Sequence, residues 1–151
     1  MHRALPLIFA LAIGCGKPTA TIGYGAAEEF TAYEAGDSVG LVVAPQGGFG
    51  ISVRLWTTAL QCDAPVEVLM ETWLGDERTG TFTNPSVQLY CQGGSKAMLW
   101  GIVVGFDPEV YSTNEDLLDL DGETIRLEIT ATDSEGTAAT GEVDIVVDVG
   151  G

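Results

Sequence analysis

The sequence predicts an all-β fold, a single antiparallel β-sandwich. Apolar residues alternate with polar residues along most of the chain from Glu28 onward, and this period of two is typical of strands with one buried face. Gly, Pro, Asn and Asp separate these segments at the short intervals that favour a sandwich. A length of 151 residues leaves room for one domain, and 46% hydrophobic against 19% charged residues excludes a disordered chain.

The first fifteen residues predict export. A positive start, Met1-His2-Arg3, precedes the apolar run Ala4–Ile13. The run is too short for a bilayer core of about 30 Å, which needs about 20 residues, and is typical of a signal peptide. Its end, Leu11-Ala12-Ile13-Gly14-Cys15, resembles the lipobox of bacterial lipoproteins, in which the cysteine is lipidated and becomes the first mature residue. This resemblance implies a signal peptide over residues 1–14 and a lipid on Cys15.

The residues around Cys15 also bear on the location. The lipobox prefers Leu three places before the cysteine, where this chain has Ala12. Because Ala12-Ile13-Gly14 also fits an ordinary secretion site, a secreted or periplasmic soluble protein is the alternative. Gly16 follows the cysteine, and the lack of Asp there resembles lipoproteins sorted to the outer membrane. We therefore expect an outer-membrane lipoprotein of the cell envelope, attached to the membrane by its lipid.

The cysteine count predicts a disulfide. The chain has three cysteines, Cys15, Cys62 and Cys91. Lipidation of Cys15 leaves Cys62 and Cys91 as an even pair in an oxidising compartment, where a disulfide is expected.

The segment after the signal peptide is interpreted as the lipidated cysteine and a flexible tether, residues 15–27. Residues 16–27 are rich in Gly, Ala, Thr and Pro and show no sustained apolar period. The alternative is an N-terminal edge strand, because Ile22 and Tyr24 alternate briefly with polar or small residues. The β-sandwich domain is expected over residues 28–151.

Alternation defines the strands of that domain. The run Ala97–Phe106 is nearly all apolar, which predicts a central strand covered on both faces. Val87, Leu89 and Cys91 are expected to point inward. Turn residues at Asp133–Gly136 predict a closing hairpin, and Glu115–Leu120 has room for one helical turn at most. The expected strands are Val39–Val43, Ile51–Leu60, Pro65–Leu74, Ser86–Gln92, Ala97–Phe106, Thr124–Thr132 and Glu142–Val149.

Two further resemblances concern the mature chain. Gly122–Val149 resembles the last two strands of immunoglobulin-like and PKD-like domains, which implies an immunoglobulin-like β-sandwich and nothing about ligands. Glu34–Leu60 is similar to a segment of uncharacterised exported lipoproteins, in which Pro-Gln-Gly-Gly-aromatic-His precedes a strand. Here Pro45–Phe49 is followed by Gly50 in place of the histidine, and the resemblance implies no activity.

Charge and composition exclude several functions. The chain carries 22 acidic and 6 basic residues, a net charge of -16. Loss of residues 1–14 removes His2 and Arg3, so the mature chain has no histidine and a net charge of 5 - 22 = -17. Such a chain repels nucleic acid, and it lacks an imidazole for nucleophilic catalysis or zinc ligation. Glu67 and Glu71 on one strand face are interpreted as solvated acids, not a glycosidase pair, so no enzyme is expected.

An acid-rich segment, Asn114–Glu123, is the candidate metal site. Ca²⁺ takes six to eight oxygen ligands, and an Asp-x-Asp-Gly turn presents several of them. Asp116, Asp119 and Asp121 are the candidate ligands, and an ordinary acidic turn is the alternative. No other cofactor is expected.

Two tryptophans are the candidate binding residues. Trp56 and Trp73 lie opposite the aliphatic faces of their strands, and exposed aromatic rings suit contact with protein or sugar. We expect a non-enzymatic envelope lipoprotein that acts as a binding or structural module on a protein or glycan partner. The alternative is a Ca²⁺-dependent adhesion or carbohydrate-binding module.

Overall fold

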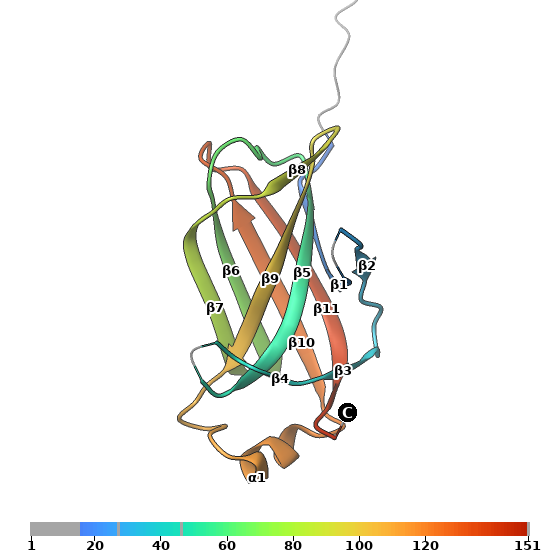
Figure 1. Ribbon diagram of the computed structural model, residues 1–151, viewed down its shortest axis with the longest axis vertical. Helices are drawn as coiled ribbons and strands as arrows, with labels where there is room; N and C mark the ends of the chain where they lie inside the picture. The colour runs from blue at the N-terminus through green and yellow to red at the C-terminus, as the bar shows by residue number, and fades with distance from the viewer. Residues whose placement is uncertain (1–15, 27, 46, 151) are drawn as a thin grey trace, which may run out of the picture.

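The computed structural model describes residues 16–26, 28–45 and 47–150 and has the predicted all-β fold (Figure 1). Signal peptide and Cys15 lie outside the described residues, so the lipid anchor stays a prediction. The elements, in chain order, are β1 (Thr19–Tyr24), β2 (Thr31–Ala32), β3 (Ser38–Gly40), β4 (Val42–Val43), β5 (Phe49–Thr58), β6 (Val66–Leu74), β7 (Glu77–Val87), β8 (Tyr90–Gly93), β9 (Lys96–Phe106), α1 (Asn114–Leu117), a 3-10 turn (Leu118–Leu120), β10 (Thr124–Thr132) and β11 (Ala138–Asp148).

Seven of these strands form a closed ring. The hydrogen-bonded order is β1-β11-β10-β6-β7-β9-β5, and β5 pairs with β1 again. The pairing therefore runs continuously around a barrel, where two separate sheets were predicted. Closure depends on two short seams, Thr19 opposite Thr140 between β1 and β11, and Gly80–Thr81 opposite Gly105–Phe106 between β7 and β9.

Strand β1 corrects the prediction of a flexible tether. Thr19–Tyr24 pairs antiparallel with β5 and parallel with β11, and Ala20 and Ile22 are buried. Close approach of β1 to β11 requires Gly141, because a Cβ there would collide with the carbonyl of Ala20. The brief alternation at Ile22 and Tyr24 marks a strand inside the barrel wall.

The closing hairpin has the strands and the turn that the sequence predicts. β10 and β11 pair without a shift from Thr124 opposite Val146 to Thr132 opposite Ala138. At the turn, the carboxylate of Asp133 accepts hydrogen bonds from the backbone N–H groups of Glu135 and Thr137. Inward-facing residues of β10 are fully buried, as the alternation predicted: Ile125, Leu127, Ile129 and Ala131.

Two predicted strands are each divided. Val39–Val43 becomes β3, which pairs with β11, and β4, which pairs with β5. The chain therefore crosses from one part of the ring to another within this stretch. Ser86–Gln92 is split between the end of β7 and the start of β8, and Cys91, predicted inward, is exposed.

The predicted Cys62–Cys91 disulfide is confirmed, with the two Cα atoms 5.5 Å apart. It joins the segment after β5 to β8, which pairs with β9. In the described part of the chain, no helix has the length and hydrophobicity needed to cross a bilayer.

Candidate functional site

A β-bulge in β9 shapes the outer surface of the barrel. Val53 pairs with Ile102 and Leu55 with Leu99, so Arg54 alone faces the two residues Trp100 and Gly101. Gly101 has a φ of 78°, a left-handed conformation that favours glycine. The bulge turns Trp100 outward. The prediction that this strand is covered on both faces is therefore wrong, since Gly101 is exposed and Trp100 is half-buried.

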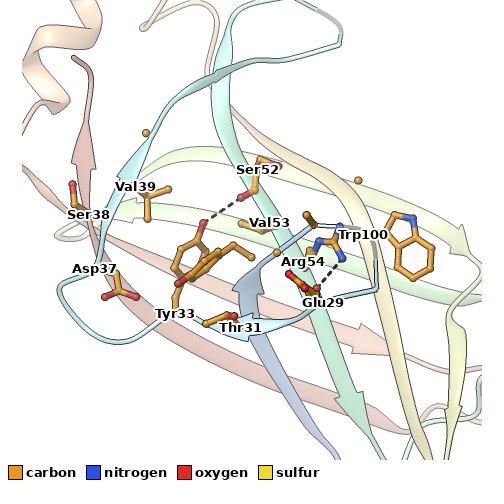
Figure 2. A pocket seen from close by; sticks show the side chains of 15 residues that line it. Glu29, Thr31, Tyr33, Asp37, Ser38, Val39, Ser52, Val53, Arg54 and Trp100 are labelled. Atoms are coloured by element: carbon orange, nitrogen blue, oxygen red, sulfur yellow. Dashed lines mark hydrogen bonds between the residues drawn. The ribbon is translucent and has the colours of Figure 1, made fainter. Parts of the chain in front are cut away.

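Trp100 is part of a three-residue stack. The ring of Tyr90 lies parallel to it, with centroids 4.0 Å apart and an interplanar angle of 11°. Cζ of Arg54 lies 5.9 Å from the Trp100 ring, within cation–π range. Nη1 of Arg54 also donates a hydrogen bond of 2.9 Å to the carbonyl of Glu29 (Figure 2). These contacts hold the guanidinium at the edge of a groove.

The groove has a volume of about 1020 Å³ and lies between the segment from β1 to β3 and the outer faces of β5 and β9. Tyr24 and Tyr33 line it with ring centroids 5.0 Å apart, and Tyr24 is 46% exposed. Figure 2 shows Tyr33 pointing at Ser52, whose carbonyl accepts a hydrogen bond from the phenol at 3.4 Å. The other polar lining residues are Glu29, Thr31, Asp37, Ser38 and Arg54.

The phenol of Tyr33 stays protonated at neutral pH. Burial raises its pKa above the ordinary value of 10.0, and the neighbouring Tyr24 and Asp37 raise it further. The groove therefore combines a neutral phenol, two aromatic rings, hydroxyl groups and charges of both signs. Such a lining suits orientation of a polar ligand by hydrogen bonds and contact with its apolar faces.

Trp56, one of the two predicted binding residues, lies beside this groove on the outer face of β5. Its ring packs against Phe30 with centroids 5.7 Å apart. Phe30 in turn covers Gly23, where a Cβ would lie 2.8 Å from the phenylalanine ring. Trp56 therefore supports the segment that forms one wall of the groove.

Trp73 lies on β6, in a different part of the ring. Arg126 on β10 pairs with it across the strands, and Cζ of Arg126 lies 5.9 Å from its ring. Glu71 on the same strand forms an ion pair with Arg78, in which Nη1 of Arg78 lies 3.0 Å from Oε1 of Glu71. The structure therefore does not bring Trp56 and Trp73 together in one site.

The three candidate calcium ligands do not converge. Oδ2 of Asp116 accepts hydrogen bonds from the backbone and hydroxyl groups of Ser112 and of Thr113, the N-cap residue of α1. The hydroxyl of Thr113 is the main cause of a lowered pKa for Asp116. Oδ1 of Asp121 accepts a hydrogen bond from the backbone N–H of Val149. Within the described residues, Asp119 belongs to no metal-binding group either. Across residues 16–26, 28–45 and 47–150, no three Asp, Glu, His or Cys side chains are arranged to hold a metal ion.

Comparison with known proteins leaves the site to be interpreted from its own chemistry: no family model and no curated protein matches the sequence. Sequence reasoning missed the groove residues Tyr24, Tyr33, Arg54 and Trp100. One local signal was present, because Gly101 interrupts an apolar strand and such a glycine indicates a bulge or a close approach.

Proposed function

We propose that this chain is a non-enzymatic binding module of the bacterial cell envelope, whose ligand lies in the groove beside Arg54 and Trp100. The observation that carries the proposal is the bulge at Trp100 and Gly101. Bulges often re-aim a side chain next to a functional site. Here the bulge contains Trp100, which lies on the outside of a small barrel and stacks on Tyr90 of β8, a residue that is 49% exposed. Exposed aromatic groups at a groove are typical of interaction sites.

Attachment through a lipid on Cys15 would hold the barrel close to the outer membrane. Thr19 already belongs to β1, so the chain between Cys15 and the barrel spans at most roughly 14 Å when extended. β1 begins at the end of the barrel that carries β8, and α1 lies at the other end (Figure 1). We infer that the acidic end around α1 faces away from the bilayer.

We also infer that the barrel is an immunoglobulin-like domain. The neighbouring strands β1-β5-β9 and β6-β10-β11 follow the orders A-B-E and C-F-G of the two sheets of such a sandwich, and β7, in the place of strand D, pairs mainly with β6. The parallel pairing of β1 with β11 and the short β7–β9 seam then join sheets that are otherwise separate. This interpretation is supported by the strand order and leaves the ligand undetermined.

Photo-crosslinking in cells tests the binding proposal. A benzophenone amino acid at Ser52, which is exposed in the groove, should form an adduct with an envelope component. The same amino acid at Thr140, an exposed position on β11, is the control and should form none. Adduct formation at Ser52 should fall when Arg54→Ala removes the guanidinium. Equal adducts at both positions, or none at Ser52, would contradict a binding site in this groove.

A further inference from the structure

A second groove continues the first along the barrel surface. It has a volume of about 830 Å³ and is lined by Pro45, Gly47, Thr81, Thr83, Val103 and Asp107, among others. Gly101 lines both grooves. The two hollows therefore meet at the bulge, and we call them together the trough, which follows the outer face of β9. From Trp100 to Phe106 this stretch of β9 alone spans roughly 20 Å.

The glycines of the strands give independent evidence for a ligand. Most of the described strand glycines have a reason within the fold: Gly93 and Gly101 have positive φ, and Cβ atoms at Gly23, Gly50, Gly80 and Gly141 would collide with neighbouring atoms. Gly40 and Gly105 have neither reason. Their φ values are not in the left-handed region, and a Cβ at either would meet no described atom within 4 Å.

Gly40 and Gly105 both line the trough, one in each half. Glycine weakens a strand because it adds backbone entropy and packs no side chain, and in strands it often marks a place where a ligand approaches closely. The fold does not require these two glycines, whereas a ligand lying along the trough would. Side chains at these two positions would narrow the trough, and their absence leaves room along it.

We propose that the trough binds an extended, uncharged polysaccharide. This inference rests on the proposed binding function and names its ligand class. Each sugar ring offers hydroxyl donors and acceptors together with an apolar C–H face. The trough presents matching groups along its length: the rings of Tyr24 and Tyr33, and the hydroxyl groups of Thr31, Ser38, Thr81 and Thr83.

Charge favours an uncharged polymer over an anionic one. The trough lining contains carboxylates at Glu29, Asp37 and Asp107 and guanidinium groups at Arg54 and Arg78. These charges of both signs can accept from and donate to hydroxyl groups. The net charge of -16 on the whole chain repels uronic acid or sulfated polymers at long range.

An extended peptide fits less well. A peptide that adds to a sheet uses the backbone groups of a free strand edge. Just beyond the residues that line the trough, β7 carries Pro85, which has no N–H to donate, and proline on an edge strand opposes such addition. The trough instead presents side-chain hydroxyl and charged groups, such as Thr81, Thr83 and Arg54, which can form hydrogen bonds with sugar hydroxyls.

Binding of the full chain, purified in detergent, to a polysaccharide array tests the proposal. The array holds unbranched glucan, mannan, xylan and chitin chains beside their carboxymethylated forms. We expect binding to at least one uncharged chain and weaker binding to its anionic form. Gly105→Val and Gly40→Val should each weaken this binding by about tenfold or more, because the added side chains occupy the trough.

Ala138→Val is the matched control, since it adds bulk at an exposed strand residue on β11 outside the trough. It should leave binding unchanged, and all three variants should unfold at wild-type denaturant concentrations. The inference is overturned if no uncharged chain binds, if anionic chains bind better, or if the two glycine variants bind like the control. Selection from a random decapeptide library of peptides that bind the wild type and do not bind Gly105→Val would also overturn it.

These outcomes separate the inference from the proposed function. An adduct at Ser52 that depends on Arg54, with no binding on the polysaccharide array, would keep the binding module and remove the glycan. Array binding that Gly105→Val abolishes, with no adduct in cells, would keep the trough and remove the groove beside Arg54 as the site used in the envelope.

Discussion

Arg54 on β5 lies over the ring of Trp100 on β9, 5.9 Å from its centroid, because β9 has one residue more than β5 at this point. Leu99 and Ile102 are three residues apart, so strict alternation would place them on opposite faces of β9, yet both are buried. The left-handed backbone of Gly101 absorbs the extra residue. The stack therefore depends on a backbone conformation as well as on three side chains.

Gly101→Ala should lower the free energy of unfolding by about 1 to 2 kcal/mol, because the left-handed conformation opposes a Cβ. Gly105→Ala in the same strand is the control. Its φ is not left-handed and a Cβ there meets no described atom, so this variant should be neutral or slightly stabilising. Urea denaturation of both variants measures the difference, and equal stabilities would contradict the assigned strain.

The closing hairpin could be predicted because its signals are local. Thr124–Thr132 alternates without interruption, and Asp133–Gly136 supplies turn residues directly after it. The closure of the barrel could not be predicted in the same way. Its seams join residues far apart in the chain, such as Thr19 and Thr140, and no local pattern records that pairing.

In the candidate site, too, residues with a local signal could be predicted and residues that depend on long-range pairing could not. Trp56 was identified because alternation in its own strand places it outward. Trp100 lies in an apolar run whose uniform composition predicted cover on both faces, and the bulge that exposes it depends on register with Arg54. Tyr24 and Tyr33 meet only because β1 joins the barrel and the following segment folds back over it.

Ile22→Ala should destabilise the domain by about 2 to 5 kcal/mol, because Ile22 is a buried residue of the barrel core. Thr21→Ala, at the exposed neighbouring position, should cost less than about 1 kcal/mol. Denaturant unfolding of the two variants distinguishes a strand from a tether. Two equally small effects would show that Thr19–Tyr24 contributes little to the fold in solution.

Removal of the disulfide by the double variant Cys62→Ala, Cys91→Ala should cost about 3 to 4 kcal/mol. The bond closes a loop with a sequence separation of 29, and the unfolded chain gains entropy when the loop opens. Reductant should destabilise the wild-type protein by a similar amount and leave the double variant unchanged. An effect of reductant on the double variant would point to a cause other than this bond.

Cys15→Ser should release the protein from membranes. The lipobox-like segment predicts a thioether-linked lipid on Cys15, and serine cannot carry it. In detergent phase partition, the wild type should enter the detergent phase and the variant the aqueous phase. Cys62→Ser is a control for loss of a cysteine and should still partition into detergent. A wild type that is already aqueous would favour the secreted or periplasmic alternative.

The lowered pKa of Asp133 should make the stability of the fold depend on pH. Its side chain is largely buried, with 7% exposed, and burial alone would raise the pKa. Backbone N–H groups of Thr137, Gln61 and Glu135 donate to the carboxylate, and together they hold the pKa below the ordinary value of 3.8. A pKa that is lower in the folded state stabilises the fold above the unfolded-state value. This stabilisation is lost as the pH falls through the folded-state pKa.

Asp133→Asn should therefore lower the free energy of unfolding at pH 7 by about 1 to 3 kcal/mol, because the amide replaces one acceptor oxygen with a donor. The difference from wild type should shrink as the pH falls below 3.8 and through the lower folded-state pKa, because the wild-type carboxylate then becomes protonated. Urea denaturation at constant ionic strength measures both curves. Glu135→Gln removes one charge from the same turn and keeps the Asp133 carboxylate, so it should retain the wild-type pH dependence. If Asp133→Asn and wild type lose stability in parallel, the hydrogen bonds to Asp133 do not favour its charged form.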